Sequence, residues 1–358
     1  MRRWHVGPSP LHCFSMTQTT NRRWVLARRP TGLVTASDFR LEEAPVPEPG
    51  DGEFVVRTHY LSLAPVMAQY VLDGGTIERP VAIGGTMRGR GVGRIVASRN
   101  PKFPEGAVVH GPLGWQDYAL MDGSRLTYVS RFAGRVAPMS TAIGVLGITG
   151  YTAYFGLELA RPQPGDRILV SGAVGGVGSS VGQIARIRGC SPIVAICGSA
   201  EKQRLATERL GYDSAINYRS ADLAAELDRL FPEGIDIYFD NTGGRILELA
   251  LDRLRQGARI ILCGAISQYM ANGKPVGPSN YFKLAYANAS MHGFQIYAFA
   301  DRYLEAEAAL GRWIEEGQLT WLEDRLEGLE VMPEALERLY TGGNVGKQIV
   351  RVVLEETP

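Results

Sequence analysis

A glycine-rich loop is the first part of the sequence whose residue types and spacing suit a chemical task. The segment SGAVGGVGSSVGQIARIRG, residues 171–189, holds six glycines between an apolar run and a stretch with helical spacing. Small residues at positions 173, 175 and 178 match the G-x-G-x-x-G pattern, with alanine first, that lets a backbone approach a pyrophosphate. The strand-like run before it and the helix after it favour a dinucleotide cradle over a turn without a ligand. The residues of this cradle are Gly175, Gly176, Val177 and Gly178.

The end of the next strand-like run, PIVAIC, indicates which dinucleotide binds. NAD sites usually place an acidic residue there for the ribose 2′-hydroxyl, but this run ends in Cys197 and continues as GSAEK. Ser199 can donate a hydrogen bond and Lys202 can supply a charge, and both suit a 2′-phosphate. The sequence therefore favours NADP(H). The alternative for Lys202, an ordinary exposed lysine at the start of a helix, stays open.

Composition bounds the class of protein that holds this loop. The chain has 358 residues, 45% of them apolar and 21% charged, which suits an ordinary globular protein of two domains. A formal net charge of +1 gives no reason to expect nucleic acid or a membrane surface as partner, and no apolar run is long enough to span a bilayer. The cysteines are scattered, which favours a reducing cytoplasmic location; they are Cys13, Cys190, Cys197 and Cys263.

Two patterns of residue composition along the chain predict an α/β fold with a second, β-rich domain. Residues 17–139 hold short β-branched and aromatic runs separated by proline and glycine, and residues 140–321 alternate strand-like and helix-like stretches, which is typical of a doubly wound parallel sheet. The tail, residues 322–358, ends in a strand that we expect to return to the first domain. Residues 1–16 are expected to be a disordered extension outside the fold, because Met16 resembles a natural start and prolines interrupt any signal sequence.

This arrangement is similar to the medium-chain alcohol dehydrogenases, so zinc ligands have to be sought. A catalytic zinc needs several Cys, His or carboxylate ligands, yet residues 84–89 read GGTMRG where a Gly-His-Glu motif would stand, and no four cysteines are closely spaced. The histidines are dispersed along the chain, at His5, His12, His59, His110 and His292. We therefore expect no metal, which makes hydride delivery to an activated electrophile easier than alcohol oxidation.

Several further motifs resemble the zinc-independent medium-chain reductases of the prostaglandin/leukotriene reductase and curcumin reductase type. The resemblance runs from about residue 22 to the end and is carried by TAYFG at 152–156, VGQIA at 181–185, YFDNTGG at 238–244, CGAISQY at 263–269 and GNVGK at 343–347. It implies a Rossmann domain for NADP(H) and a GroES-like domain built from the N-terminal part and the C-terminal tail. It also implies a homodimer that reduces the C=C bond of α,β-unsaturated ketones and aldehydes.

The resemblance also implies roles for single residues. Lys202 and Tyr218 would contact the 2′-phosphate, and Asn344 would close over the cofactor from the tail. The nicotinamide would be lined by Asn241, Cys263, Gly264, Ala265, Ile266, Ser267, Tyr269, Phe294, Gln295 and Ile296. Each has a purely structural alternative, since turns and cores use the same residue types.

Reduction of an enone places negative charge on its carbonyl oxygen, so a preorganised donor is required. Tyr286, which matches a tyrosine at the family's active site, is expected to be this donor or the proton source, with packing alone as the alternative. Tyr269 is the second candidate.

One stretch departs from the family. Ala64-Pro65-Val66-Met67-Ala68 stands where Asp-Pro-Tyr-Met-Arg is common, so the substrate wall at Val66 is more apolar, with Tyr70 as a replacement hydroxyl. Loss of the arginine favours neutral enones over acids. Two alternatives stay open, reduction of quinones or carbonyls and binding of NADPH without turnover.

Overall fold

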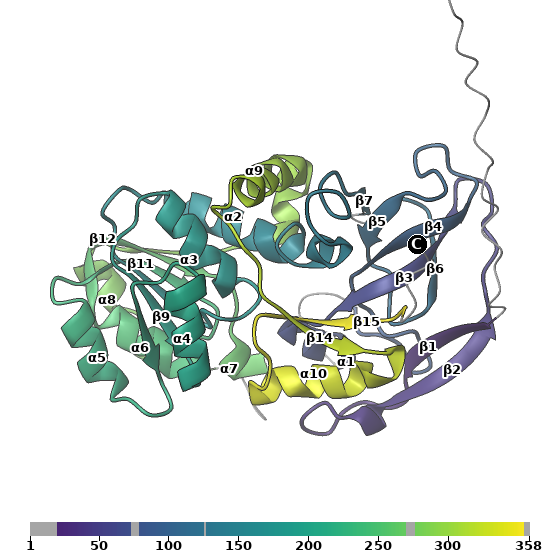
Figure 1. The fold of residues 1–358 in the computed structure, drawn as a ribbon. Helices are drawn as coiled ribbons and strands as arrows, with labels where there is room; N and C mark the ends of the chain where they lie inside the picture. The colour runs from purple at the N-terminus through teal and green to yellow at the C-terminus, as the bar shows by residue number, and fades with distance from the viewer. Residues whose placement is uncertain (1–19, 73–78, 125–126, 270–275, 354–358) are drawn as a thin grey trace, which may run out of the picture.

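Two lobes lie side by side in the computed structural model, and the C-terminal segment crosses from one to the other (Figure 1). The structure describes residues 20–72, 79–124, 127–269 and 276–353, so the expected extension at residues 1–16 lies outside the described residues. The lobe at the left of Figure 1 is built from the middle of the chain, and the other lobe combines its beginning with its end.

The first lobe contains a six-stranded sheet in which all neighbouring strands are parallel. The strand order is β10-β9-β8-β11-β12-β13. This order reverses between β8 and β11, which is the point where ligands bind in open α/β sheets. The strands are β8 (Ile168–Ser171), β9 (Ile193–Cys197), β10 (Ser214–Asn217), β11 (Ile235–Asp240), β12 (Leu254–Leu262) and β13 (Ser290–Gly293).

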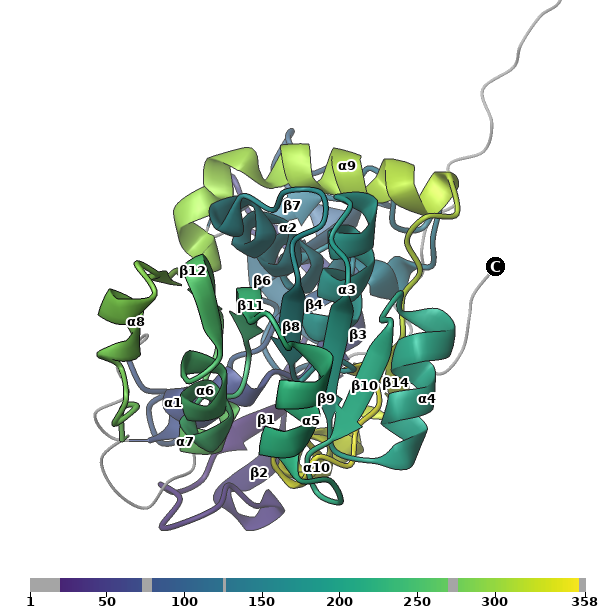
Figure 2. The same cartoon turned by 90° about the vertical axis from the view of Figure 1, so that its left-hand side faces the viewer.

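Helices cover both faces of this sheet because its strands are apolar on both sides. Ile168 and Val170 of β8 join one buried cluster and Leu169 joins another, as the alternation of side chains along a strand requires. On the first face lie α2 (Ile148–Ala160), α3 (Gly178–Ile187), α4 (Ala200–Arg209) and α9 (Tyr303–Glu315). On the second lie α5 (Leu223–Leu230), α6 (Gly244–Leu251) and α8 (Lys283–Tyr286). Figure 2 shows α2 and α9 packed beside each other above the strands. The doubly wound sheet predicted from the sequence is confirmed.

The second lobe is β-rich and includes the C-terminal tail. Its main sheet has the order β14-β15-β3-β4-β5-β7, with β6 also paired to β3. The tail strand β15 lies antiparallel to β3, with Ile349 opposite Ser62. The strands are β3 (Phe54–Ser62), β4 (Gly91–Ser98), β5 (Val108–Gly111), β6 (Tyr118–Met121), β7 (Tyr128–Val129), β14 (Glu323–Glu327) and β15 (Lys347–Arg351). The predicted fold class, a Rossmann sheet plus a GroES-like β-rich part completed by the tail, is confirmed.

Three further pieces complete this lobe. A hairpin of β1 (Thr20–Leu26) and β2 (Phe39–Pro45) forms its own two-stranded sheet. Helix α10 (Met332–Thr341) contributes to a buried cluster with Leu61 and Trp115. After β3 the chain forms the short turn η2 (Pro65–Met67) and the single helical turn α1 (Ala68–Val71). The turn η2 contacts α7 (Ile266–Tyr269) of the first lobe.

Two elements differ from the sequence-based expectation. The helical pattern at GRILELALDRLRQG ends early, because the carbonyl of Arg253 accepts a hydrogen bond of 2.8 Å from Ile235 and the chain enters β12. The apolar run SMHGFQIYAF is a strand only over Ser290–Gly293. Beyond it the chain forms 3-10 turns (η4, Ile296–Arg302), and Phe294 packs edge-on against Phe299.

Candidate cofactor and substrate site

The glycine loop lies between β8 and α3, at the point where the strand order reverses. A Cβ on Gly178 would lie 2.4 Å from the carbonyl oxygen of Gly172, so no larger residue fits there. A Cβ on Gly176 would lie 3.0 Å from Thr149 Cγ2 and 3.1 Å from Lys347 Cδ. The loop is thus closed on itself and flanked by Thr149 and Lys347, a shape that suits a pyrophosphate at the start of a helix.

The C-terminal tail holds this loop from the other side. Gly346 donates its N–H to the carbonyl of Val174 at 2.8 Å, and Gly175 and Gly346 form a parallel bridge. The Nδ2 group of Asn344 donates to the carbonyl of Gly346 at 3.0 Å. Asn344 is therefore placed beside the loop, as the family resemblance implies, although it lies on a segment more than 160 residues away in sequence.

The expected 2′-phosphate residues gather at the ends of β9 and β10. Ser199 caps α4, and its Oγ accepts from the Lys202 N–H at 3.2 Å. The Lys202 Nζ donates to the carbonyl of Gly342 at 2.9 Å, and burial lowers the pKa of Lys202. A Cβ on Gly198 would lie 3.4 Å from the Tyr218 hydroxyl, so this ring covers the strand end.

Arg219 joins this group and was not among the residues that the sequence suggested. Its guanidinium lies 5.7 Å from the centroid of the Tyr218 ring, and its Nε donates to the Tyr218 hydroxyl at 3.3 Å. Its Nη2 reaches the carbonyl of Thr341 at 3.4 Å. The only signal in the sequence was its position directly after Tyr218.

The expected nicotinamide residues lie at the carboxyl ends of β11 and β12. Asn241 donates its backbone N–H to Ser171 Oγ at 2.9 Å and its Nδ2 to the Ser171 carbonyl at 2.8 Å, which links it to the glycine loop. Cys263 donates its N–H to the carbonyl of Asp240 at 2.9 Å, and burial raises the pKa of its thiol to about 12. The structure thus brings together Asn241 and the segment Cys263, Gly264, Ala265, Ile266 and Ser267.

Tyr269 ends this segment at the boundary between the lobes. Its hydroxyl accepts from the Ala265 N–H at 3.2 Å, and a Cβ on Gly264 would lie 3.3 Å from that hydroxyl oxygen. Burial raises the pKa of Tyr269, so the phenol stays protonated and able to donate.

The structure does not bring Tyr286 to the site. Its side chain is 69% exposed, and its ring contacts only Phe282 at 5.3 Å among the ring contacts of the described residues. Its carbonyl accepts from Gln256 Nε2 at 2.8 Å, near the amino end of β12. Tyr286 therefore lies at the opposite end of the sheet from the glycine loop, because the chain between β12 and β13 has to return to the amino ends of the strands.

The segment after β13 packs partly against the core of the cofactor lobe. The Phe294 ring is turned into the core, since a Cβ on Gly156 would lie 3.0 Å from its Cζ. Gln295 is exposed, and the carbonyl of Ile296 accepts from the Tyr303 hydroxyl at 2.9 Å. The next residue, Tyr297, is the one that lines a cavity.

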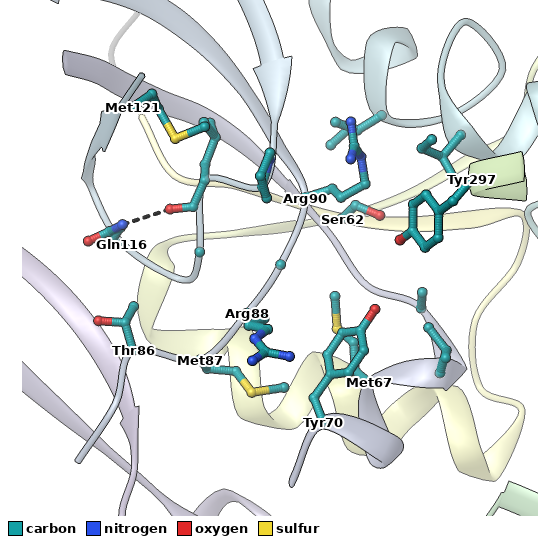
Figure 3. Close-up of a pocket in the computed structure, with 18 of the residues that line it drawn as sticks. Ser62, Met67, Tyr70, Thr86, Met87, Arg88, Arg90, Gln116, Met121 and Tyr297 are labelled. Atoms are coloured by element: carbon teal, nitrogen blue, oxygen red, sulfur yellow. Dashed lines mark hydrogen bonds between the residues drawn. The ribbon is translucent and has the colours of Figure 1, made fainter. Parts of the chain in front are cut away.

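That cavity, of about 1020 Å³, is lined mainly by the β-rich lobe, together with Ile148, Thr149 and Tyr297 of the other lobe. Val66 and Tyr70, the two substrate residues suggested by the sequence, both line it. Thr149 and Lys347, which flank Gly176, line it as well, so the cavity lies next to the phosphate cradle. Figure 3 shows the side chains of Ser62, Tyr70, Arg88, Arg90 and Tyr297 around the hollow.

Two histidines lie in the sheet of this lobe, His110 buried and His59 partly buried. Burial lowers the pKa of His59 to about 4 and that of His110 to about 3, so both rings are neutral. In the part of the chain that the structure describes, no three His, Cys, Asp or Glu side chains are grouped to hold a metal ion. Within those same residues, no helix has the length and apolar character needed to cross a bilayer.

The comparisons with known proteins agree with this geometry. A family described as the N-terminal domain of oxidoreductase matches residues 22–129, and one described as zinc-binding dehydrogenase matches residues 176–311. The chain is 39% identical over 338 residues to the NADPH-dependent curcumin reductase of Escherichia coli (strain K12), which covers 93% of this chain and 97% of that one. It is 36% identical over 346 residues to the NADP(+)-dependent 2-alkenal reductase of Nicotiana tabacum, with 94% and 99% covered.

A solved structure extends the similarity to three dimensions. CurA from Vibrio vulnificus in complex with NADPH superposes with a TM-score of 0.87 at 38% identity, over 93% of this chain and all of that one. The chain therefore belongs to the medium-chain dehydrogenase/reductase family, in the group of NADP-dependent oxidoreductases that includes curcumin reductase and 2-alkenal reductase.

Proposed function

We propose that this protein reduces the C=C bond of α,β-unsaturated ketones or aldehydes with NADPH. The observation that carries the proposal is that the cavity lies next to the phosphate cradle: Thr149 and Lys347 line the cavity and also flank Gly176 of the glycine loop. A nicotinamide that extends from the cradle past Thr149 would reach the cavity. The relatives' printed names, curcumin reductase and 2-alkenal reductase, support this reaction class.

The residues that would hold NADPH fall into three groups by their chemistry. The loop at Gly175–Gly178 offers helix-start N–H groups to the pyrophosphate. Ser199, Lys202, Tyr218 and Arg219 offer hydroxyls and two cations to the 2′-phosphate. Asn241, Asn344 and the segment Cys263–Tyr269 would surround the nicotinamide end.

When bound, NADPH supplies the hydride that forms the new C–H bond at the β-carbon of the substrate. As the C=C π bond breaks, negative charge develops on the carbonyl oxygen of the substrate, and a fixed donor stabilises it. We assign this donation to the Tyr269 hydroxyl, whose raised pKa keeps it protonated. The proton that completes the reaction at the α-carbon comes from the same hydroxyl, which is restored from solvent.

The assembly and location of the protein are part of the proposal. β13 is an end strand of the sheet, and three exposed aromatic side chains lie just before it, Tyr281, Phe282 and Tyr286, with 61%, 58% and 69% of their surface exposed. A strand edge that pairs with no other described strand, beside an apolar patch, suits a homodimer. The free thiols of Cys190, Cys197 and Cys263 suit a reducing cytoplasm.

The deciding experiment is incubation with NADPH and a panel of enones and enals, followed by identification of the product. A saturated ketone or aldehyde supports the proposal. An allylic alcohol, or turnover of quinones alone, would assign the protein to carbonyl or quinone reduction. Tight NADPH binding with no consumption on any substrate would make it a binding protein without turnover.

A further inference from the structure

The last residues of α10 accept hydrogen bonds from both cations of the proposed 2′-phosphate site. The Gly342 carbonyl accepts from Lys202 Nζ at 2.9 Å. The Thr341 carbonyl accepts from Arg219 Nη2 at 3.4 Å. An ammonium has three N–H donors and a guanidinium has five, so each cation can bind a phosphate and keep its bond to the helix. A bound 2′-phosphate would therefore order both cations and, with them, the end of α10.

The residue just before these two carbonyls, Tyr340, contacts the wall of the substrate cavity. Its hydroxyl donates to the carbonyl of Pro65, the first residue of η2, at 2.9 Å. Val66 and Met67 of the same turn line the cavity, as does Tyr70 of α1. Burial raises the pKa of Tyr340, so its phenol stays protonated and able to donate. Tyr340 itself is absent from the described lining of the cavity, so it acts on the cavity through η2.

The end of α10 is packed as one unit. Leu339 is buried in the same cluster as Met67 of η2, and Tyr340 packs against that cluster. The N–H of Gly343 donates to the carbonyl of Arg338 at 3.1 Å, which closes the last turn of the helix. Groups in such a close-packed turn shift together, because no space is left for them to move singly. A ligand that orders the two carbonyls therefore also orders the Tyr340 ring.

We propose that Tyr340 is a positioning residue that couples the 2′-phosphate of NADPH to the substrate wall. A bound phosphate fixes the end of α10, and Tyr340 thereby fixes η2 against α7, the helix that ends in Tyr269. In its consequence for the substrate, the proposal rests on the proposed ene-reductase function. NADPH and NADH have the same nicotinamide, so the coupling predicts that they differ in how tightly the protein binds its substrate.

Hydrogen–deuterium exchange tests the coupling without turnover. In the wild-type protein, the amides of residues 66–72 are expected to exchange about 5- to 10-fold more slowly with saturating NADPH than with saturating NADH. Tyr340→Phe keeps the ring and is expected to abolish this difference. The matched control is Tyr154→Phe, which removes a phenol hydroxyl that donates to Glu305 Oε1 at 3.1 Å on α9, and it should keep the difference.

Steady-state kinetics with an enone test the consequence for the substrate. With each cofactor at saturation, the wild-type KM for the enone is expected to be about 5- to 10-fold lower with NADPH than with NADH. In Tyr340→Phe the two KM values are expected to become equal. A tyrosine that only stabilised the fold would leave their ratio unchanged, because its loss would affect the reactions with both cofactors alike.

The outcomes separate the coupling from the proposed function. Equal exchange of residues 66–72 with the two cofactors in the wild-type protein would overturn the coupling, and a difference that persists in Tyr340→Phe would overturn the role of this residue. If Tyr340→Phe does not bind NADPH, Lys202→Ala at saturating NADPH takes its place: loss of the exchange difference supports the proposal and its retention overturns it. If the difference depends on Tyr340 but no enone is reduced, the coupling stands and the ene-reductase function fails.

Discussion

The ammonium of Lys202 and the carbonyl of Gly342 are joined by a hydrogen bond of 2.9 Å between residues 140 positions apart. Lys202 belongs to α4 of the cofactor lobe, and Gly342 ends α10 of the tail. The C-terminal end of α10 carries a negative partial charge, which holds the ammonium close to the end of β9 before a phosphate arrives. A 2′-phosphate there would find its cation already oriented.

Lys202→Ala is expected to weaken NADPH binding about 10- to 100-fold and NADH binding much less, because only NADPH carries the 2′-phosphate. The measurement is titration of each cofactor by quenching of protein fluorescence. Arg204→Ala removes an exposed cation of the same helix and is the control. Equal losses for both cofactors would remove Lys202 from the phosphate site.

Arg219→Ala is expected to weaken NADPH binding by about 5- to 10-fold, a smaller effect than that of Lys202, because its guanidinium also stacks on Tyr218 at the surface. Its contribution should fall with salt, since exposed charges are screened. Titration at low and high ionic strength measures this dependence, and a loss that is independent of salt would contradict a charge contact.

Tyr269→Phe is expected to lower kcat by about 10- to 1000-fold with little change in NADPH affinity, because it removes the donor to the developing oxyanion. Single-turnover reduction of an enone is the direct measurement. Tyr286→Phe is the matched control and should react at the wild-type rate, since this tyrosine lies exposed at the amino end of the sheet. A slow Tyr286→Phe variant with a fast Tyr269→Phe variant would reverse the assignment.

His110 is expected to make the protein sensitive to acid. Its pKa is lowered by burial from 6.5 to about 3, so between these values the unfolded chain binds a proton that the folded chain does not. The free energy of unfolding therefore falls as pH falls, by about 2 kcal/mol from this residue at pH 5. In urea denaturation, the unfolding free energy of His110→Phe should fall by about 2 kcal/mol less between pH 7 and pH 5 than that of the wild-type protein. The control is His292→Phe, which replaces an exposed histidine on β13; its unfolding free energy should fall with pH as much as that of the wild-type protein.

Chelation of metals is expected to leave enone reduction unchanged, because the proposed donor is a phenol. The assay is turnover before and after prolonged dialysis against a strong chelator, together with metal analysis of the purified protein. Stoichiometric zinc, or activity that returns only on adding zinc, would contradict the proposed reaction.

The parts of the structure that the sequence predicted well depend on local signals. The loop at Gly175–Gly178 lies between a strand and a helix, and the residues next to it in the sequence predict both. Small residues are required in this loop by contacts within the same turn, such as the contact of Gly178 with Gly172. The doubly wound sheet follows in the same way from short apolar runs that alternate with helical patterns. Such signals need no knowledge of distant segments.

The parts that the sequence did not predict depend on contacts between distant segments. A match to a family tyrosine could not place Tyr286, because the path from β12 back to β13 decides at which end of the sheet it lies. Arg219 becomes a candidate only because α10 approaches β10. Arg88 and Arg90 line the cavity because Trp115 packs on the opposite side of their segment. The sequence of this segment indicated only that the His and Glu of a zinc site are missing.

The hydrogen bond from Gly346 to Val174 has a consequence for cofactor exchange. The donor, Gly346, lies directly before β15, which pairs with β3 in the β-rich sheet, and the acceptor, Val174, belongs to the glycine loop. If the lobes separate, we expect either that this hydrogen bond breaks or that the loop moves together with the tail. We therefore expect release of the dinucleotide from the loop to be coupled to movement of the tail strand β15.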